Sequence, residues 1–330
     1  MSATKAGGRI LVTVLITLFL CACSPAASPR PVLTPITVQL QWTHQAEFAG
    51  LYAADLQGYY AAEGLAVTFL QGGPDVDNLA AVRDGKAQFG TASADQLIAA
   101  RAAGMPVQAL AAVYRRSPTV FFSLKQSGIT RPQDFAGKKV RVTSTVVVTL
   151  HAMTNRVGLA PEQYSEVNLP SDIQMFASGE VPVWGGFING IVVAVQEAGY
   201  AINIISPDDY GVHFYGDCLI ATDETINNQP DLTLRFLRAS LKGWTYAVEN
   251  PEKVGDLVVK YEPKADIKIE NLRMLASLPL VNTGEDHIGW MRPEVWAGMG
   301  KTLSDQKVLP AGMDVRLAYT TSFLETIYGK

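Results

Sequence analysis

The residues best suited to chemistry lie in one loop, residues 42–48, and their types fit the binding of a flat, polar ring. Within seven residues this loop supplies an indole (Trp42), an imidazole (His44), a carboxylate (Glu47) and a phenyl ring (Phe48). Aromatic side chains pack against planar ligands, and a few polar groups beside them fix the orientation of the ring. The alternative is that Trp42 and Phe48 only close the hydrophobic core beneath the loop.

The segments around this loop predict a strand before it and a helix after it. Apolar and polar residues alternate over 38–42, which is typical of a β-strand. Over 48–59 apolar residues recur every three or four positions, as on one face of a helix, and alternation resumes over 65–69. In such a βαβ unit the loop lies at the carboxyl edge of the sheet, where open α/β sheets bind ligands. The predicted position of the loop therefore agrees with a binding role.

Polar residues also follow the next two predicted strands. Asp75 lies in a turn-rich stretch after the second strand, and Ser93 and Asp95 come after a short third strand that contains Phe89. Since the carboxyl ends of parallel strands meet at one edge of a sheet, we expect these side chains near the loop. Ser93 has a second interpretation as the N-cap of the next helix. The two roles are compatible, because a helix N-terminus also offers N–H groups to a ligand.

The first 23 residues predict export from the cytoplasm. A basic start precedes an apolar run at 10–20, which is too short to span a bilayer and is typical of a signal peptide. The run ends in the letters LCAC, similar to a bacterial lipobox in which Cys23 is lipidated. The alternative is a plain secretory signal that is cut a few residues later. We expect a signal peptide over 1–22, a lipidated tether over 23–35, and a lipid-anchored protein on the extracytoplasmic face of the cell membrane.

Charge, motifs and cysteine content exclude several function classes. The chain has 27 basic and 31 acidic residues and no run of Lys or Arg, so we expect no nucleic-acid partner. No P-loop, dinucleotide fingerprint, H-E-x-x-H or G-x-S-x-G motif occurs. The four histidines are scattered, so we expect no metal site, and nothing in the sequence calls for a cofactor. Cys218 lies in a predicted strand beside Asp217, which predicts a buried, unreactive thiol.

Two blocks of alternating strands and helices predict an α/β protein with two lobes. The first block covers 36–117, and a second block of the same build covers 118–217. The segment 218–330 returns to the first lobe, and we expect its helices to pack there. Breaks in the pattern near 117–122 and 214–220 predict two crossings between the lobes, which would act as the hinge of a closing motion.

The order of these parts resembles the solute-binding subunits of ABC importers. The letters L-x-W-T, G-L-Y-A-A and G-Y-Y-x-x-E-G-L, between residues 40 and 65, are similar to the family that binds thiamine pyrimidine precursors and riboflavin. So are R-S-P and F-F-S at 116–123, and D-Y-G and F-Y-G-D at 209–217. The resemblance covers nearly all of the chain after Pro35. It implies a periplasmic-binding-protein (type II) fold, a vitamin-like ligand between the lobes, and an ABC permease with its ATPase as partners.

The same family contains a yeast-type pyrimidine synthase, and this chain departs from the synthase. In the synthase and in the pyrimidine binders, the loop after the first Trp resembles W-x-P-N-x-x-H or a close variant, whereas here His44 stands at the Pro position, Glu47 near the amide and Phe48 in place of the histidine. The cysteine-rich segment of the synthase has no counterpart. These departures argue against synthase activity and against a phosphorylated pyrimidine as the ligand, so we expect a binding protein and no enzyme. Asn189, in the letters F-I-N-G, is the one residue carried over, from a Tyr/Thr-Asn-Glu-Pro-like loop of relatives.

We expect riboflavin as the ligand, with a thiamine pyrimidine precursor as the first alternative and a synthase-like enzyme as the second. The aromatic rings of Trp42, Phe48, Tyr52 and Trp184, which come from both lobes, would sandwich the flat ring of the ligand. Each aromatic pair adds about 0.5–1.5 kcal/mol to binding beyond the effect of burial. An acidic cleft suits a neutral polyol better than a phosphate, unless Arg115 and Arg116 point into it.

The candidate ligand-binding residues are the aromatic and polar side chains at the predicted cleft, and we expect the protein to act as a monomer. The full set is Trp42, Glu47, Phe48, Tyr52, Asp75, Ser93, Asp95, Tyr114, Trp184, Asn189, Tyr215 and Asp217.

Overall fold

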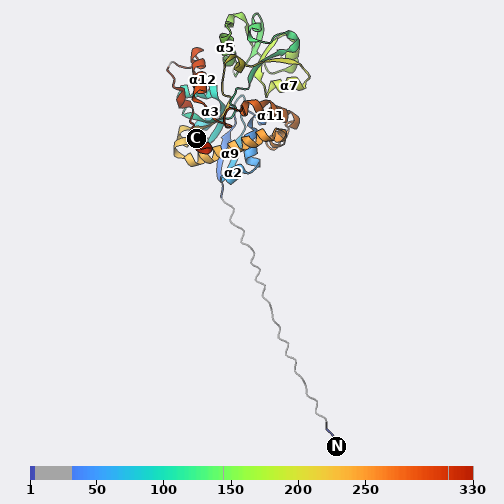
Figure 1. Cartoon of the computed structure of the whole chain (residues 1–330), viewed down its shortest axis with the longest axis vertical. Helices are drawn as coiled ribbons and strands as arrows, with labels where there is room; N and C mark the ends of the chain where they lie inside the picture. The colour runs from blue at the N-terminus through green and yellow to red at the C-terminus, as the bar shows by residue number, and fades with distance from the viewer. Residues whose placement is uncertain (4–31, 144, 311, 330) are drawn as a thin grey trace. The chain divides into compact units, whose positions relative to one another are not determined.

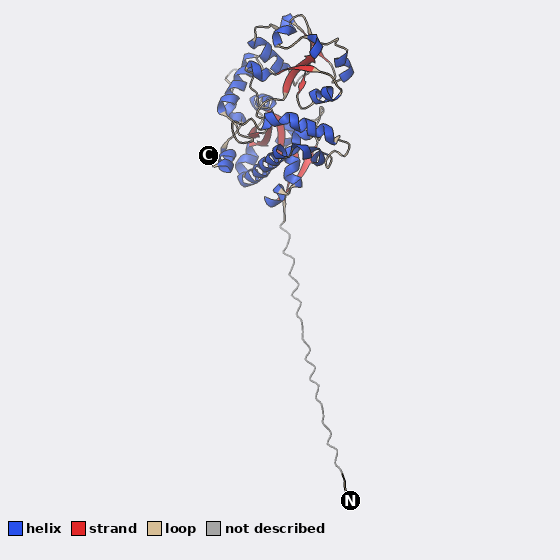
Figure 2. Cartoon of the chain, turned by 45° about the vertical axis from the view of Figure 1, so that its right-hand side comes forward, coloured by secondary structure: helices blue, strands red, loops and turns tan. Residues whose placement is uncertain are grey.

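Two β-sheets, each flanked by helices, make up the chain from Leu33 onward (Figures 1 and 2). The computed structural model describes residues 1–3, 32–143, 145–310 and 312–329. The apolar part of the predicted leader, Cys23 and most of the predicted tether therefore lie outside the described residues. Within the described part of the chain, no helix is both long and apolar enough to cross a membrane.

The first sheet has the strand order β2-β1-β3-β10-β4. β1 pairs in parallel with β2 and β3, whereas β10 runs antiparallel to β3 and β4. Its strands are β1 (Thr34–Gln39), β2 (Leu65–Leu70), β3 (Phe89–Ser93), β4 (Val107–Ala112) and β10 (Asp217–Thr222). Thr34 and Pro35, which we placed at the end of the tether, are the first two residues of β1 and pair with Leu65 and Ala66.

The second sheet repeats this arrangement with the order β7-β6-β8-β5-β9. β6 is parallel to β7 and β8, and β5 is antiparallel to β8 and β9. Its strands are β5 (Thr119–Leu124), β6 (Lys139–Val142), β7 (Ser165–Asn168), β8 (Val183–Phe187) and β9 (Ile202–Ile205). The chain changes sheets between β4 and β5 and again between β9 and β10. The predicted α/β fold with two crossings is thus confirmed, while the residue limits of the lobes stay a prediction.

Helices cover both sheets and fill the C-terminal part of the chain (Figure 2). In the first lobe, before the crossing, are α1 (Ala49–Leu56), α2 (Tyr59–Ala62), α3 (Asn78–Arg83) and α4 (Ala94–Ala102). The second lobe has α5 (Val147–Arg156), α6 (Ile173–Ala177) and α7 (Ile191–Glu197). After β10 come α8 (Asp223–Asn228), α9 (Pro230–Glu249), α10 (Val254–Val258), α11 (Ile267–Val281), α12 (Pro293–Asp305) and α13 (Ser322–Tyr328). α9, α10, α12 and α13 pack on first-lobe elements, and α11 also contacts α7 of the second lobe.

The first strand ends earlier than the sequence pattern predicts, and this creates the loop at 42–48. β1 ends at Gln39, because the backbone N–H of Gln41 donates to the side-chain hydroxyl oxygen of Thr91 on β3 (2.8 Å) and not to a backbone carbonyl of a neighbouring strand. The N–H of Gly72 then donates to the carbonyl of Trp42 (3.0 Å). A Cβ at position 72 would lie 2.3 Å from the carbonyl oxygen of Leu40. Only glycine therefore allows the two backbones to approach so closely.

Two glycines allow α1 and α9 to pack in direct backbone contact. A Cβ on Gly243 of α9 would lie 2.0 Å from the carbonyl oxygen of Gly50 on α1. A Cβ on Gly50 would lie 2.1 Å from Cγ of Trp244. The absence of both side chains lets the indole of Trp244 lie flat against α1, and this close packing sets the position of one wall of the site described below.

Candidate functional site

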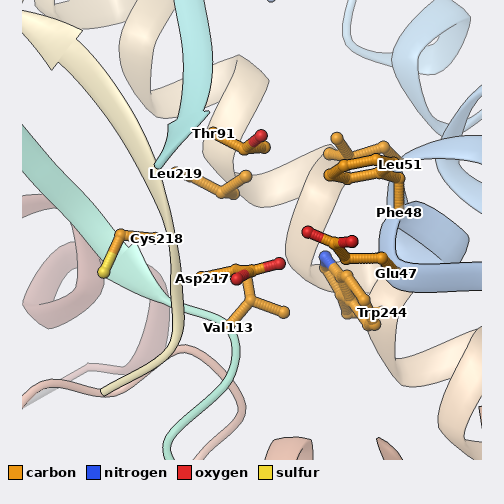
Figure 3. Close-up of a pocket in the computed structure, with 9 residues that line it drawn as sticks. All are labelled: Glu47, Phe48, Leu51, Thr91, Val113, Asp217, Cys218, Leu219 and Trp244. Atoms are coloured by element: carbon orange, nitrogen blue, oxygen red, sulfur yellow. The ribbon is translucent and has the colours of Figure 1, made fainter. Parts of the chain in front are cut away.

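A small pocket lies in the first lobe, where the loop at 42–48 faces β10 and α9 (Figure 3). The space inside it, measured for the centre of a water molecule, is about 10 Å³, which is room for about one water. Three predicted site residues, Glu47, Phe48 and Asp217, line it. The complete lining is Glu47, Phe48, Leu51, Thr91, Val113, Asp217, Cys218, Leu219 and Trp244.

Two carboxyl groups, those of Glu47 and Asp217, point toward each other across this pocket (Figure 3). Glu47 belongs to the short 3-10 helix Ala46–Phe48, which leads into α1. Both of its oxygens accept hydrogen bonds from amide groups: Oε1 from Nε2 of Gln41 (2.6 Å) and Oε2 from Nε2 of Gln45 (2.5 Å). These two hydrogen bonds fix the orientation of the Glu47 carboxylate, which is the acceptor in both.

Asp217 is the more deeply buried of the two acids. It is the first residue of β10, pairs with Ser93 of β3, and is 8% exposed. Burial raises the pKa of the Asp217 carboxyl well above its usual range, and the nearby carboxylate of Glu47 raises it further. The Asp217 side chain is in hydrogen-bond contact with Glu47 and Gln41, while its Oδ2 accepts no hydrogen bond from the described residues. The protonated form of Asp217 is therefore favoured.

The indole nitrogen of Trp244 is a second buried polar atom without a partner in the described part of the chain. Trp244 is 2% exposed and its Nε1 is directed at the space beside Glu47 (Figure 3). Phe48 and Leu51 form the apolar wall opposite the indole. The pocket thus combines aromatic walls with an acceptor, a protonated carboxyl and a free N–H donor.

A hydrogen-bonded group beside the pocket joins the two lobes. Tyr114, next to Val113 of the lining, donates from its hydroxyl to Oγ of Ser277 on α11 (3.1 Å). Nδ2 of Asn189, between β8 and α7 in the second lobe, donates to Oγ of Ser277 (3.0 Å) and to the hydroxyl of Tyr114 (3.4 Å). Burial raises the pKa of Tyr114, so its hydroxyl stays neutral. Tyr114 and Asn189, both predicted site residues, therefore lie together where the lobes meet.

The predicted aromatic residues are divided between surface and core. Trp42 is 42% exposed, whereas Tyr52 is fully buried in the first lobe. The Tyr52 ring is stacked on Tyr261 with centroids 4.3 Å apart, and its hydroxyl hydrogen-bonds Nδ1 of His44 (2.8 Å). Since Tyr52 has these partners and does not line the pocket, the structure does not bring it to the candidate site.

Trp184 and Tyr215 lie away from the pocket. Trp184 is fully buried in the core of the second lobe, where its Nε1 donates to the carbonyl of Val181 (2.9 Å). Tyr215 packs against Trp296, and its hydroxyl accepts from the backbone N–H of Arg292 (2.7 Å). Burial raises the pKa of Tyr215 to about 12. The sandwich of rings expected from both lobes is therefore not formed in this structure.

The remaining predicted polar residues lie at strand ends, at different depths. Asp75 is exposed in the turn before α3. Ser93 occupies the N-cap position of α4, but its side chain makes no capping bond to the helix and instead lies in hydrogen-bond contact with Asp95. Burial raises the pKa of Asp95, which is also close enough to Asp217 to raise the pKa of that carboxyl. Ser93 and Asp95 thus lie behind the pocket without lining it.

The two arginines at the first crossing are held by acidic partners. The guanidinium of Arg115 is buried and donates to Asp286 (3.0 Å), to Thr283 and to the carbonyl of Trp290 (3.2 Å). Arg116 pairs with Asp208, which precedes the second crossing, and with Glu285 (3.0 Å). Both guanidinium groups are therefore committed to ion pairs outside the pocket lining.

Several residues of the site were not in the predicted set, among them Gln41, Thr91, Trp244 and Ser277, which carry hydrogen-bonding groups, and the lining residues Leu51, Val113, Cys218 and Leu219. Gln41 lies in the segment predicted as a strand, and Trp244 is one of many apolar residues in the segment that forms α9, so neither stood out. No sequence signal distinguishes a buried indole with a free N–H from one that only fills the core.

Two other chemistries can be judged from the described part of the chain. No group of three or more His, Cys, Asp or Glu side chains there could hold a metal ion. Cys218, at the back of the pocket, is buried, and burial raises the pKa of its thiol well above the usual value, so the thiolate is disfavoured.

Three relatives are similar over most of the chain. The riboflavin-binding protein RibY of Chloroflexus aurantiacus is 25% identical over 338 residues, covering 94% of this chain and 96% of the relative. The formylaminopyrimidine-binding protein of Halalkalibacterium halodurans is 26% identical over 269 residues, covering 79% and 81%. A 4-amino-5-hydroxymethyl-2-methylpyrimidine phosphate synthase of Legionella pneumophila is 25% identical over 299 residues, covering 88% and 92%.

A solved structure and a family model agree with these relatives. The periplasmic aliphatic sulphonate binding protein SsuA from Escherichia coli superimposes with a TM-score of 0.68 at 15% identity, covering 86% of this chain and 91% of that chain. At this identity the likeness shows the fold alone, and it confirms the expected periplasmic-binding-protein fold. The family model described as NMT1/THI5 like matches residues 45–254, more than half of the sequence. The chain therefore belongs to the NMT1/THI5-like family.

Proposed function

We propose that the protein is the solute-binding component of an ABC importer and that it binds a neutral, vitamin-like heteroaromatic, riboflavin in preference to a thiamine pyrimidine precursor. The observation that carries this proposal is the pocket in which Oδ2 of Asp217 and Nε1 of Trp244 are buried without partners. A buried polar atom without a partner costs about 1–3 kcal/mol. A ligand whose ring edge supplies the missing partners removes that cost and binds tightly.

The named relatives support a binding role and a vitamin-related ring. Of the three, the riboflavin-binding protein aligns over the largest share of this chain. The ion pairs of Arg115 and Arg116 also favour a neutral ligand, because a phosphate requires guanidinium, ammonium or helix N–H groups that are free to bind it.

A pyrimidine-synthase-like enzyme is the alternative from another class, since one similar relative is a synthase. Phe48 stands where the histidine of the synthase-like motif is expected, and the one thiol at the pocket, Cys218, is buried. We therefore propose binding without turnover. Incubation of the pure protein with candidate vitamins, followed by mass spectrometry, separates the two functions, because an enzyme releases a new product and a binding protein returns the ligand unchanged.

The proposal includes a lipid anchor at Cys23, an extracytoplasmic location on the cell membrane, and action as a monomer that delivers its ligand to an ABC permease and its ATPase. The lipobox-like letters before Cys23 support the anchor. A Cys23→Ser variant should move from the membrane fraction to the soluble extracytoplasmic fraction with its ligand affinity unchanged. Retention of this variant in the membrane would contradict the anchor.

Flavin fluorescence tests the ligand directly. Titration of riboflavin with the purified protein should quench flavin emission, and protein purified from rich medium should carry a yellow ligand that native mass spectrometry identifies. Trp42→Ala should abolish quenching without lowering the melting temperature, since Trp42 is 42% exposed in the loop that also carries Glu47 and Phe48 of the pocket lining. Leu317→Ala, which removes a 51% exposed side chain in the C-terminal region, is the matched control. Equal affinity of the two variants would refute the role of Trp42.

A further inference from the structure

The polar groups of the pocket form a set that determines which ring edge can bind. Nε1 of Trp244 can only donate a hydrogen bond. Glu47 acts as an acceptor, since both of its oxygens already receive amide N–H groups. Oδ2 of Asp217 has no partner in the described part of the chain and faces the same space.

The protonation of the acid pair follows from its geometry. Two carboxyl groups that face each other in a buried pocket cannot both be ionised, because like charges at short range repel strongly where water is excluded. One proton is therefore shared in the ligand-free protein, in the hydrogen-bond contact between Asp217 and Glu47, and the amide donors on Glu47 favour its position on Asp217. To a ligand that inserts between the two acids, the pocket presents two donors, the Asp217 O–H and the Trp244 N–H, together with one acceptor, the Glu47 carboxylate.

We infer that this pocket recognises the imide edge of a heteroaromatic ring, in which one N–H lies between two carbonyl oxygens. This inference rests on the proposed function and names the chemical class of its ligand. The N–H of the imide donates to Glu47, and the two carbonyl oxygens accept from Asp217 and Trp244. Every unpartnered buried atom described above then has a partner.

An aminopyrimidine edge matches this set less well. It offers one ring nitrogen as an acceptor beside one amino group as a donor, so it satisfies Glu47 and one of the two donors. The other donor stays buried without a partner, which weakens binding. The pocket therefore discriminates between two ring types of similar size and flatness through hydrogen bonding, where shape alone would not.

Ligand analogues test the inference with the wild-type protein. N3-methylriboflavin has the same ring but no imide N–H, and its affinity should fall by about tenfold or more, because the Glu47 carboxylate loses its donor. Formylaminopyrimidine should bind at least tenfold more weakly than riboflavin. Isothermal titration gives all three affinities on one protein sample.

Two tryptophan variants test the indole donor. Trp244→Phe removes the N–H but keeps an aromatic wall, and it should lower riboflavin affinity about two- to tenfold. Trp296→Phe is a matched control, because Nε1 of Trp296 is also buried without a partner in the described residues but lies beside Tyr215 and Tyr319, outside the pocket. The control should leave the affinity unchanged.

Two variants of Asp217 test the carboxyl donor. Asp217→Asn keeps an N–H donor and should recover part of the riboflavin affinity that Asp217→Ala loses.

The outcomes separate this inference from the function on which it rests. If riboflavin binds and N3-methylriboflavin binds equally well, or if Trp244→Phe and Trp296→Phe behave alike, imide recognition is wrong while flavin binding stands. If formylaminopyrimidine binds and riboflavin does not, imide recognition is wrong and a heteroaromatic-binding protein remains. If no heteroaromatic binds the wild-type protein, both the inference and the proposed function fall.

Discussion

Asp217 should make the stability of the ligand-free protein fall as the pH rises, and Asp217→Asn should remove this effect. Burial and the Glu47 carboxylate raise the pKa of Asp217 in the folded state, whereas in the unfolded chain the group titrates near its ordinary value of about 4. Between these two pKa values the folded state holds one proton more than the unfolded state. The free energy of unfolding then decreases by about 1.4 kcal/mol per pH unit from this group alone.

The size of the effect can be measured as a difference between two proteins. Asparagine keeps the shape of the side chain and does not titrate. The free energy of unfolding of Asp217→Asn minus that of the wild type should therefore rise with pH by about 1.4 kcal/mol per unit, starting near pH 4 and ending at the folded pKa. Urea unfolding at pH 5, 6 and 7 resolves this slope, and titrating groups that do not interact with Asp217 cancel in the difference.

Asp84→Asn is the control for this experiment, since Asp84 is exposed and its pKa is lowered by the hydrogen bond from Arg83. A carboxyl group whose pKa is lowered on folding stabilises the folded protein, and this stabilisation is lost only as the pH falls below about 4. The difference in unfolding free energy between Asp84→Asn and the wild type should therefore be flat from pH 5 to 7. A flat curve for Asp217→Asn as well would show that Asp217 is ionised in the folded protein. The reasoning about the acid pair, and with it the donor role of Asp217, would then be refuted.

Two further predictions concern the packing of the site and the contact between the lobes. Gly50→Ala should destabilise the protein by about 1–3 kcal/mol and weaken ligand binding, because the new Cβ would lie 2.1 Å from Cγ of Trp244. The control is Gly298→Ala, which has open space around it and should not lower the stability. Equal melting temperatures of the two variants would contradict this prediction. Asn189→Ala removes the hydrogen bonds to Ser277 and Tyr114 and should increase the radius of gyration of the ligand-free protein in small-angle X-ray scattering, and an unchanged radius would show that these bonds do not hold the lobes together.

Much of the fold could be predicted from local patterns, because apolar residues recur at every second position in the strands and at every third or fourth position in the helices of each βαβ unit. The part of the site that comes from such a unit could also be predicted. Glu47 and Phe48 lie in the loop after the first strand and line the pocket, and Asp217, at the second crossing, faces them. These positions follow from the general rule that ligands bind at the carboxyl edge of an α/β sheet.

The residues that were missed or misplaced depend on packing between distant segments. Trp244 reaches the pocket because Gly50 and Gly243 allow α1 and α9 to touch, and neither glycine carries a local signal of that contact. Trp184 and Tyr215 were expected at the cleft as members of the predicted ligand-binding set. Their rings fill the cores of the second and first lobes instead, and sequence alone does not tell which face of a strand meets the core.

The energy of the contact between the lobes explains how a pocket the size of one water can serve a ligand with several rings. Asn189 makes two hydrogen bonds across the gap, each worth about 0.5–1.5 kcal/mol net. Lys268 of α11 also pairs with Glu197 of α7, an exposed ion pair of a kind worth at most about 1 kcal/mol. The free-energy difference between an open form and this one therefore contains a few kcal/mol from these polar contacts, in addition to the ion pair of Arg116 with Asp208 and the apolar core that extends through both lobes. A ring that satisfies the buried atoms of the pocket can offset that difference, which makes opening, entry and closure around the ligand thermodynamically feasible with the contacts present in the structure.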